Sequence, residues 1–127
     1  MPAREPFAYA VLRVVPRVER GEFVNAGVVL FCRGSGFLAL RSGLPEARLR
    51  ALDPGVDLAS LAGHLRTLEL IAAGDPAGGP VATQPASARF HWLVAPTSTM
   101  VQPSEVHTGL LSDPRATLDR LYEQLVV

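Results

Sequence analysis

Two apolar stretches near the N-terminus, FAYAVLRVV at residues 7–15 and EFVNAGVVLFC at residues 22–32, decide the fold. Both are rich in β-branched and aromatic residues, which favour strands. Pro16 follows the first stretch, and Arg33 and Gly34 follow the second. We predict a third strand at residues 36–41, GFLALR, because Gly34 and Gly36 suit a tight hairpin turn. Three consecutive strands with short links indicate an antiparallel meander.

Side-chain alternation predicts how the first two strands pair. A wholly apolar face, and therefore a core face, results if Val14 lies opposite Val24, Leu12 opposite Ala26, Ala10 opposite Val28, and Ala8 opposite Leu30. The second face then pairs Arg13 with Asn25, and Arg41 of the third strand turns to the same side. Gly27 on this face leaves room for a group to approach the backbone. We expect this second face to be exposed, with Phe7, Tyr9 and Phe31 on it.

Helices are expected at residues 57–73 and 113–126, both packed on one face of the sheet. Asp57 and Asp113 are good N-caps, and Gly74 is a good C-cap. Leucines recur at steps of three and four in both segments. Shorter helices are predicted for PEARLRAL, which begins at Pro45, and for ASARFHWLVAP, whose periodicity also fits a strand. The segment TMVQ is expected to add an edge strand that ends at Pro103.

These elements predict an α+β domain with a three- to four-stranded antiparallel sheet. With 127 residues and 48% hydrophobic side chains, the chain suits a single domain, residues 1–127. Residues 74–86 contain three glycines and three prolines, so we expect a flexible surface connection there.

Composition restricts the classes of function. The formal net charge is zero, which makes nucleic-acid binding an unfavoured interpretation. No apolar run approaches the roughly 18 residues that a membrane helix needs. A single cysteine, Cys32, excludes an internal disulfide and suits a reducing cytoplasm. We expect Cys32 to be a packed core residue, and no motif with metal-ligand or cofactor-binding spacing is present.

The stretch TSTMVQPSEVHTG at residues 97–109 concentrates hydroxyl groups, a carboxylate and one histidine. A catalytic His107 needs a nucleophile within hydrogen-bond reach and a third group that orients the ring. No GxSxG motif supplies that nucleophile. Because threonine and serine hydroxyls also bond neighbouring backbone, we favour a structural loop and keep a binding loop as the alternative.

Arg13, Asn25 and Arg41 form a sharper candidate, because two fixed guanidinium groups are able to clamp a phosphate or carboxylate. The alternative is that Arg13 extends into water and Asn25 bonds across the strand pair. Trp92, next to Arg89, offers a stacking surface for a base, although a lone tryptophan is more often a core residue.

The segments FAYAVLRVVPRVERGEFVNAGVVLF, RFHWLVAP and STMVQPSEVHTGL, followed by a C-terminal helix, resemble the bacterial domain of unknown function family 3037. The resemblance covers nearly the whole chain. It implies a small cytoplasmic bacterial protein, similar to those encoded beside a HipA-like kinase, and it implies no established activity. The positions that match the motifs are Arg20, Gly21, Glu22, Asn25, Gly27, Arg89, Trp92, Gln102, His107 and Gly109.

The function that we expect is a non-catalytic interaction or regulatory module, with a HipA-like kinase or a second copy of the chain as its partner. The alternative is a phosphate- or nucleotide-binding protein, or an enzyme, that uses a polar face of arginine, asparagine and histidine. The candidate ligand-binding residues are Arg13, Asn25, Gly27, Arg41, Arg89, Trp92, Gln102 and His107.

Overall fold

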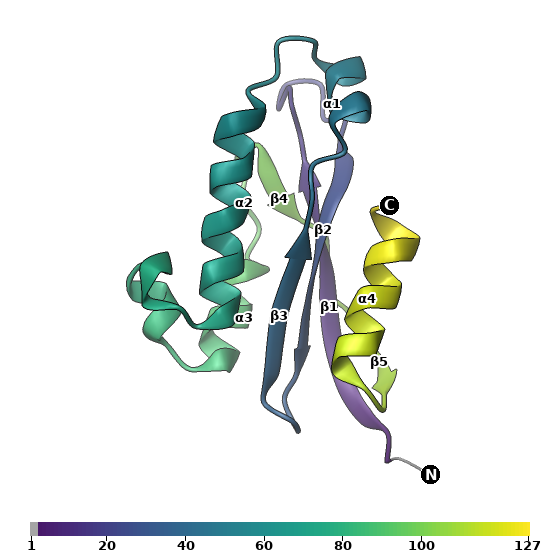
Figure 1. Ribbon diagram of the computed structural model, residues 1–127, viewed down its shortest axis with the longest axis vertical. Coiled ribbons are helices and arrows are strands. Elements are labelled where there is room, and N and C mark those ends of the chain that lie inside the picture. The colour runs from purple at the N-terminus through teal and green to yellow at the C-terminus, as the bar shows by residue number, and fades with distance from the viewer. Residues whose placement is uncertain (1–2) are drawn as a thin grey trace.

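A five-stranded antiparallel sheet lies at the centre of the computed structural model, which describes residues 3–127 (Figure 1). Its strands are β1 (Glu5–Val14), β2 (Val24–Cys32), β3 (Phe37–Ser42), β4 (Val101–Pro103) and β5 (His107–Leu111). The order is β3-β2-β1-β4, and β5 also pairs with β1. Strands β4 and β5 therefore follow one another along the same side of β1. The predicted meander and the edge strand ending at Pro103 are confirmed, whereas β5 was not predicted.

Four α-helices complete the fold: α1 (Glu46–Leu52), α2 (Leu58–Ala73), α3 (Ala86–Leu93) and α4 (Pro114–Leu125). The predicted caps are present, because Asp57 accepts a hydrogen bond from the Ser60 amide and Gly74 adopts a φ of 74°. The hydrogen bond from Ser60 lowers the pKa of Asp57 below its usual value. Residues 74–86 contain two short 3-10 helices, η1 (Pro76–Gly78) and η2 (Pro80–Thr83). Ala82 of η2 is buried in the same core cluster as residues of α2.

The α+β class is confirmed, but the prediction that both long helices cover one face is wrong. Helix α2 lies on one side of the sheet and α4 on the other, as Figure 1 shows. Strands β1 and β2 are nearly continuous apolar runs, and such runs are typical of strands buried on both faces. Helix α4 therefore covers much of the face that we expected to be exposed. Phe7 is buried on that side, and Phe31 is buried on the side of α2.

The predicted register is correct only at the open end of the first hairpin. Val14 lies opposite Val24 and Arg13 opposite Asn25, but Leu12 then lies opposite Gly27. Ala26 is the extra residue of a β-bulge, so every later pair in β2 differs by one residue from the prediction. Val28, Leu30 and Cys32 consequently face α4, whereas Val29 and Phe31 face α2.

Candidate functional site

Helix α4 engages two of the three residues of the predicted polar face. The Asn25 side-chain amide donates a hydrogen bond to the Leu125 carbonyl at 3.0 Å. The Arg41 guanidinium lies 3.0 Å from Asp119 and 3.7 Å from Glu123, and it stacks over the Tyr122 ring. These contacts link strands β2 and β3 to α4, so in this structure Asn25 and Arg41 hold the helix on the sheet.

Arg13, unlike Arg41, has no acidic partner among residues 3–127. Its guanidinium carbon lies 4.3 Å from the centroid of the Phe23 ring, and its Nε is buried without a hydrogen-bond partner. Gln102 lies opposite Arg13 in β4, and its side-chain amide donates to the Thr99 carbonyl at 2.8 Å. Arg13 therefore keeps hydrogen-bonding capacity that the described chain does not use.

The space that Gly27 was expected to leave for a ligand is filled by β3. A Cβ atom on Gly27 would lie 3.1 Å from the Arg41 carbonyl oxygen and 3.2 Å from the Ser42 Cβ. Glycine at this position therefore permits the close approach of β3 next to the bulge.

His107 lies apart from the arginines. It pairs with Tyr9 across β5 and β1, with 5.3 Å between the ring centroids, and its Nε2 is 3.8 Å from Glu105. Tyr9 and Arg13 are four residues apart on β1, a separation of roughly 13 Å along an extended strand. The structure therefore does not bring His107 and Arg13 into one compact site.

Arg89 and Trp92 lie on α3 and have different surroundings. The Arg89 guanidinium donates to the carbonyls of Ile71 and Ala72 at the end of α2, and to the Gln84 carbonyl. These bonds satisfy carbonyl groups that a helix end leaves without partners. Trp92 is 49% exposed, and with His64 it lines a hollow of about 360 Å³. Arg89 is thus engaged by the fold, whereas the Trp92 ring remains accessible.

The stretch at residues 97–109 forms most of the outer edge of the sheet. Between β4 and β5 the strand pairing is interrupted, and buried Ser104 bridges the gap. Its amide donates to the Val11 carbonyl at 2.8 Å, and its hydroxyl accepts from the Val11 amide at 2.9 Å. The same hydroxyl donates to the Glu105 carbonyl. Ser104 therefore keeps the edge attached to β1, and sequence reasoning did not single it out.

Gly109 is required by a close contact with an aromatic ring. A Cβ atom at this position would lie 2.8 Å from Cε1 of Phe7, which lies opposite in β1. We expect Gly109→Ala to lower the free energy of unfolding by about 1 kcal/mol, because the buried ring has to shift. Urea denaturation measures this cost. In a Phe7→Leu background the cost should shrink, and an equal cost in both backgrounds would contradict the contact.

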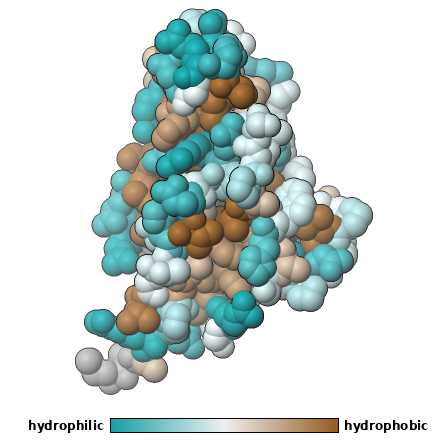
Figure 2. Space-filling model, turned by 180° about the vertical axis from the view of Figure 1, so that it is seen from behind, coloured by the Kyte–Doolittle hydropathy of each residue, from teal (hydrophilic) through white to brown (hydrophobic). Residues whose placement is uncertain are grey.

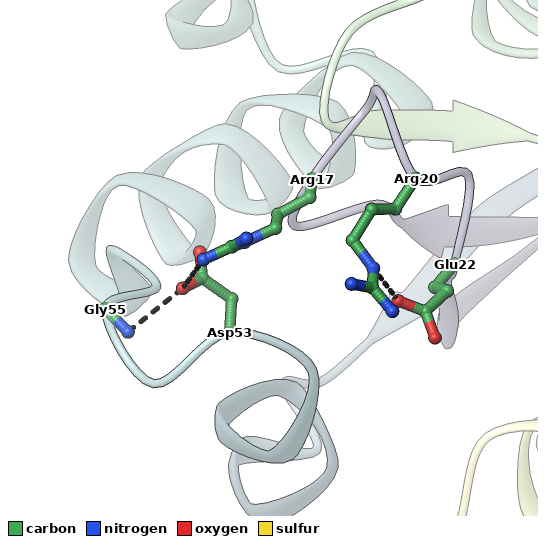
Figure 3. A network of polar contacts seen from close by, with 5 residues as sticks. All are labelled: Arg17, Arg20, Glu22, Asp53 and Gly55. Atoms are coloured by element: carbon green, nitrogen blue, oxygen red, sulfur yellow. Dashed lines mark hydrogen bonds and ion pairs between the residues drawn. The ribbon is translucent and has the colours of Figure 1, made fainter.

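The family-matching residues Arg20 and Glu22 pair with each other in the loop between β1 and β2 (Figure 3). Arg20 Nε donates to Glu22 at 2.5 Å, and this bond raises the pKa of Arg20. In the same loop, Arg17 reaches toward Asp53, whose carboxylate accepts the Gly55 amide at 3.1 Å. Exposed ion pairs of this kind contribute little to the free energy of unfolding, so we infer that these two pairs mainly hold the conformation of the loop.

A second hollow, of about 370 Å³, opens between α3 and the strands β1 and β5. We call it the α3 hollow. Its walls are mainly apolar, and Arg33, His91 and Thr108 add polar groups. Figure 2 shows apolar side chains gathered on this side of the molecule, below a hydrophilic end. None of the lining residues is among the ligand-binding candidates predicted from the sequence. The alternation of Val106, Thr108 and Leu110 is nevertheless a strand signal.

The geometry defines an α+β protein with a central antiparallel sheet, helices on both faces, and a partly apolar edge at β4 and β5. The chain belongs to the family described as protein of unknown function DUF3037, whose model matches residues 9–126. No curated protein and no solved structure matches it. Across residues 3–127, no helix is both long and apolar enough to cross a membrane. The same residues contain no group of three or more histidine, cysteine or acidic side chains arranged to hold a metal ion.

Proposed function

We propose that this protein is a non-catalytic interaction module that binds another protein through the outer edge of its sheet, residues 101–111. The observation that carries the proposal is the exposure of apolar side chains at that edge. Val106 is 42% exposed and Leu110 is 61% exposed, and Val106 also lines the α3 hollow. An unpaired strand edge with apolar side chains is a template for pairing with another chain.

The partner that we propose first is a HipA-like kinase, in line with the family resemblance, in a bacterial cytoplasm. A second copy of this chain is the alternative protein partner for the same edge. The contacts of three candidate residues support a non-catalytic role. Asn25, Arg41 and Arg89 already bond to groups of the chain itself.

Calorimetric titration of the protein with a HipA-like kinase from the same organism tests the proposal. We expect Val106→Glu to weaken the association at least tenfold, because it places a carboxylate in an apolar contact. Val18→Glu is a matched control, since Val18 is 43% exposed but lies in the loop between β1 and β2. The absence of kinase binding, together with a strictly monomeric mass by light scattering, would overturn the proposal.

One observation favours a second function, a phosphate- or nucleotide-binding protein or enzyme. Arg13 has a buried Nε without a hydrogen-bond partner and no acidic partner among the described residues. This function requires nucleotides or inorganic phosphate to raise the melting temperature, and Arg13→Ala to abolish that shift. The same shift in the variant would exclude Arg13 as the anchor.

A further inference from the structure

We propose that the outer edge at β5 binds an extended peptide segment as an additional strand, with an apolar side chain in the α3 hollow and an acidic residue beside Arg33. This inference rests on the proposed function and specifies the chemistry of the partner. Its three components are a row of side chains along this edge, a positive charge without an acidic partner on the wall of the hollow, and the backbone groups of β5.

The row consists of side chains that alternate along the edge on the side of α3. Thr108 lies opposite Ala8 and Leu110 opposite Pro6, so both project to the same face of the sheet. Val106 and Thr108 line the α3 hollow. A strand added beside β5 would run about 4.8 Å away and would direct every second side chain to this face. One such side chain would reach the mouth of the hollow.

The hollow is suited to an aromatic or branched side chain. Phe31 and Phe90 are buried at its floor with 5.3 Å between their ring centroids, and Val94 and Val106 form its sides. Its volume of about 370 Å³ exceeds the space that a single side chain fills. Burial of an apolar side chain there is favourable by roughly 2 kcal/mol before the costs of association.

Charge complementarity selects an acidic peptide. Arg33 and His91 line the hollow, and no aspartate or glutamate is among its lining residues. Arg33 lies over the Phe31 ring and 3.5 Å from the Ser87 hydroxyl, and no carboxylate among residues 3–127 forms an ion pair with it. An arginine held against an aromatic ring without an acidic partner is well placed to bind a carboxylate.

The backbone of β5 supplies the remaining bonds. In an antiparallel sheet, alternate residues of an edge strand direct their N–H and C=O groups outward. Residues 105–110 are exposed or half-buried, and β5 is hydrogen-bonded within the sheet to β1. Main-chain bonds to such an edge provide affinity in strand addition, while side-chain pockets provide selectivity.

The test is selection of a displayed library of random peptides against the whole protein, followed by synthesis of the enriched peptide. We expect enrichment of alternating apolar residues flanked by aspartate or glutamate. Arg33→Gln should weaken binding of that peptide about tenfold, through loss of a charge-assisted bond. Arg115→Gln is the matched control, because Arg115 also lies over a phenylalanine ring, Phe37, but on the side of α4. Methylation of the alternate peptide amides that face β5 should abolish binding.

The outcomes separate this inference from the proposed function. Enrichment without acidic residues, equal binding to the Arg33→Gln and Arg115→Gln variants, or binding that survives amide methylation would overturn the acidic added strand. If no peptide is enriched while Val106→Glu still disrupts the kinase complex or a dimer, the strand inference fails and the interaction module stands. If neither peptide, kinase nor second copy binds, both fail.

Discussion

Replacement of Leu118 by alanine is expected to lower the free energy of unfolding by about 3 kcal/mol. Leu118 is fully buried on α4, in a cluster that includes Val28, Leu30 and Cys32 of β2. Removal of its side chain leaves a cavity between the helix and the sheet, and the apolar burial it supplied is lost. Urea denaturation followed by circular dichroism measures the change.

Leu110→Ala is the control for this prediction, because the same side chain is removed from a position that is 61% exposed. Its cost should stay within about 0.5 kcal/mol, as is usual for exposed positions. Equal costs for the two variants would contradict the packing of α4 on this face of the sheet.

Removal of the Ser104 hydroxyl is expected to cost about 2 kcal/mol, because the Val11 amide loses its partner while it remains buried. Ser104→Ala keeps the backbone bond from residue 104 to the Val11 carbonyl, so the edge should stay attached but loosen. Hydrogen exchange of the Val11 amide should accelerate together with the loss of stability.

Ser98→Ala controls for the loss of a hydroxyl as such, because Ser98 is exposed in the loop before β4. Its stability and the exchange rate of the Val11 amide should match those of the unmodified protein. An unchanged exchange rate in the Ser104→Ala variant would contradict the prediction that this hydroxyl protects the Val11 amide.

Local signals made the four α-helices and four of the five strands predictable. Asp57 and Asp113 cap their helices as expected, and Gly74 ends α2 in the left-handed conformation. These features depend on a few neighbouring residues, so a single sequence contains them. Strand β5 had only a weak signal, because polar His107 and Gly109 interrupt the alternation of Val106, Thr108 and Leu110.

Features that depend on distant contacts were not predictable. Gly27 is a local signal of a bulge, but it does not fix where the bulge falls, and the bulge at Ala26 displaced the register of the rest of β2. The side of the sheet that each helix covers is a matter of packing, although the apolar runs of β1 and β2 were typical of strands buried on both faces.

The candidate site shows the same limit. Asn25 bonds to Leu125, a residue one hundred positions away, and Arg41 pairs with Asp119. Both side chains were candidate ligand groups only as long as their partners on α4 were unknown. Residue type indicated hydrogen-bonding capacity correctly, whereas the identity of the partner required the fold.

The bulge in β2 also determines where this strand tolerates a change in length. Ala26 and Gly27 together oppose Leu12, so deletion of Ala26 leaves Asn25 opposite Arg13 and Gly27 opposite Leu12, in a regular ladder. Deletion of Val29 instead shifts the following residues of β2 by one position, so the side chains that face α2 would face α4 and those that face α4 would face α2. Within β2, a homologue one residue shorter at position 26 would keep every other side chain on its present face and would lose only the buried Ala26 methyl group.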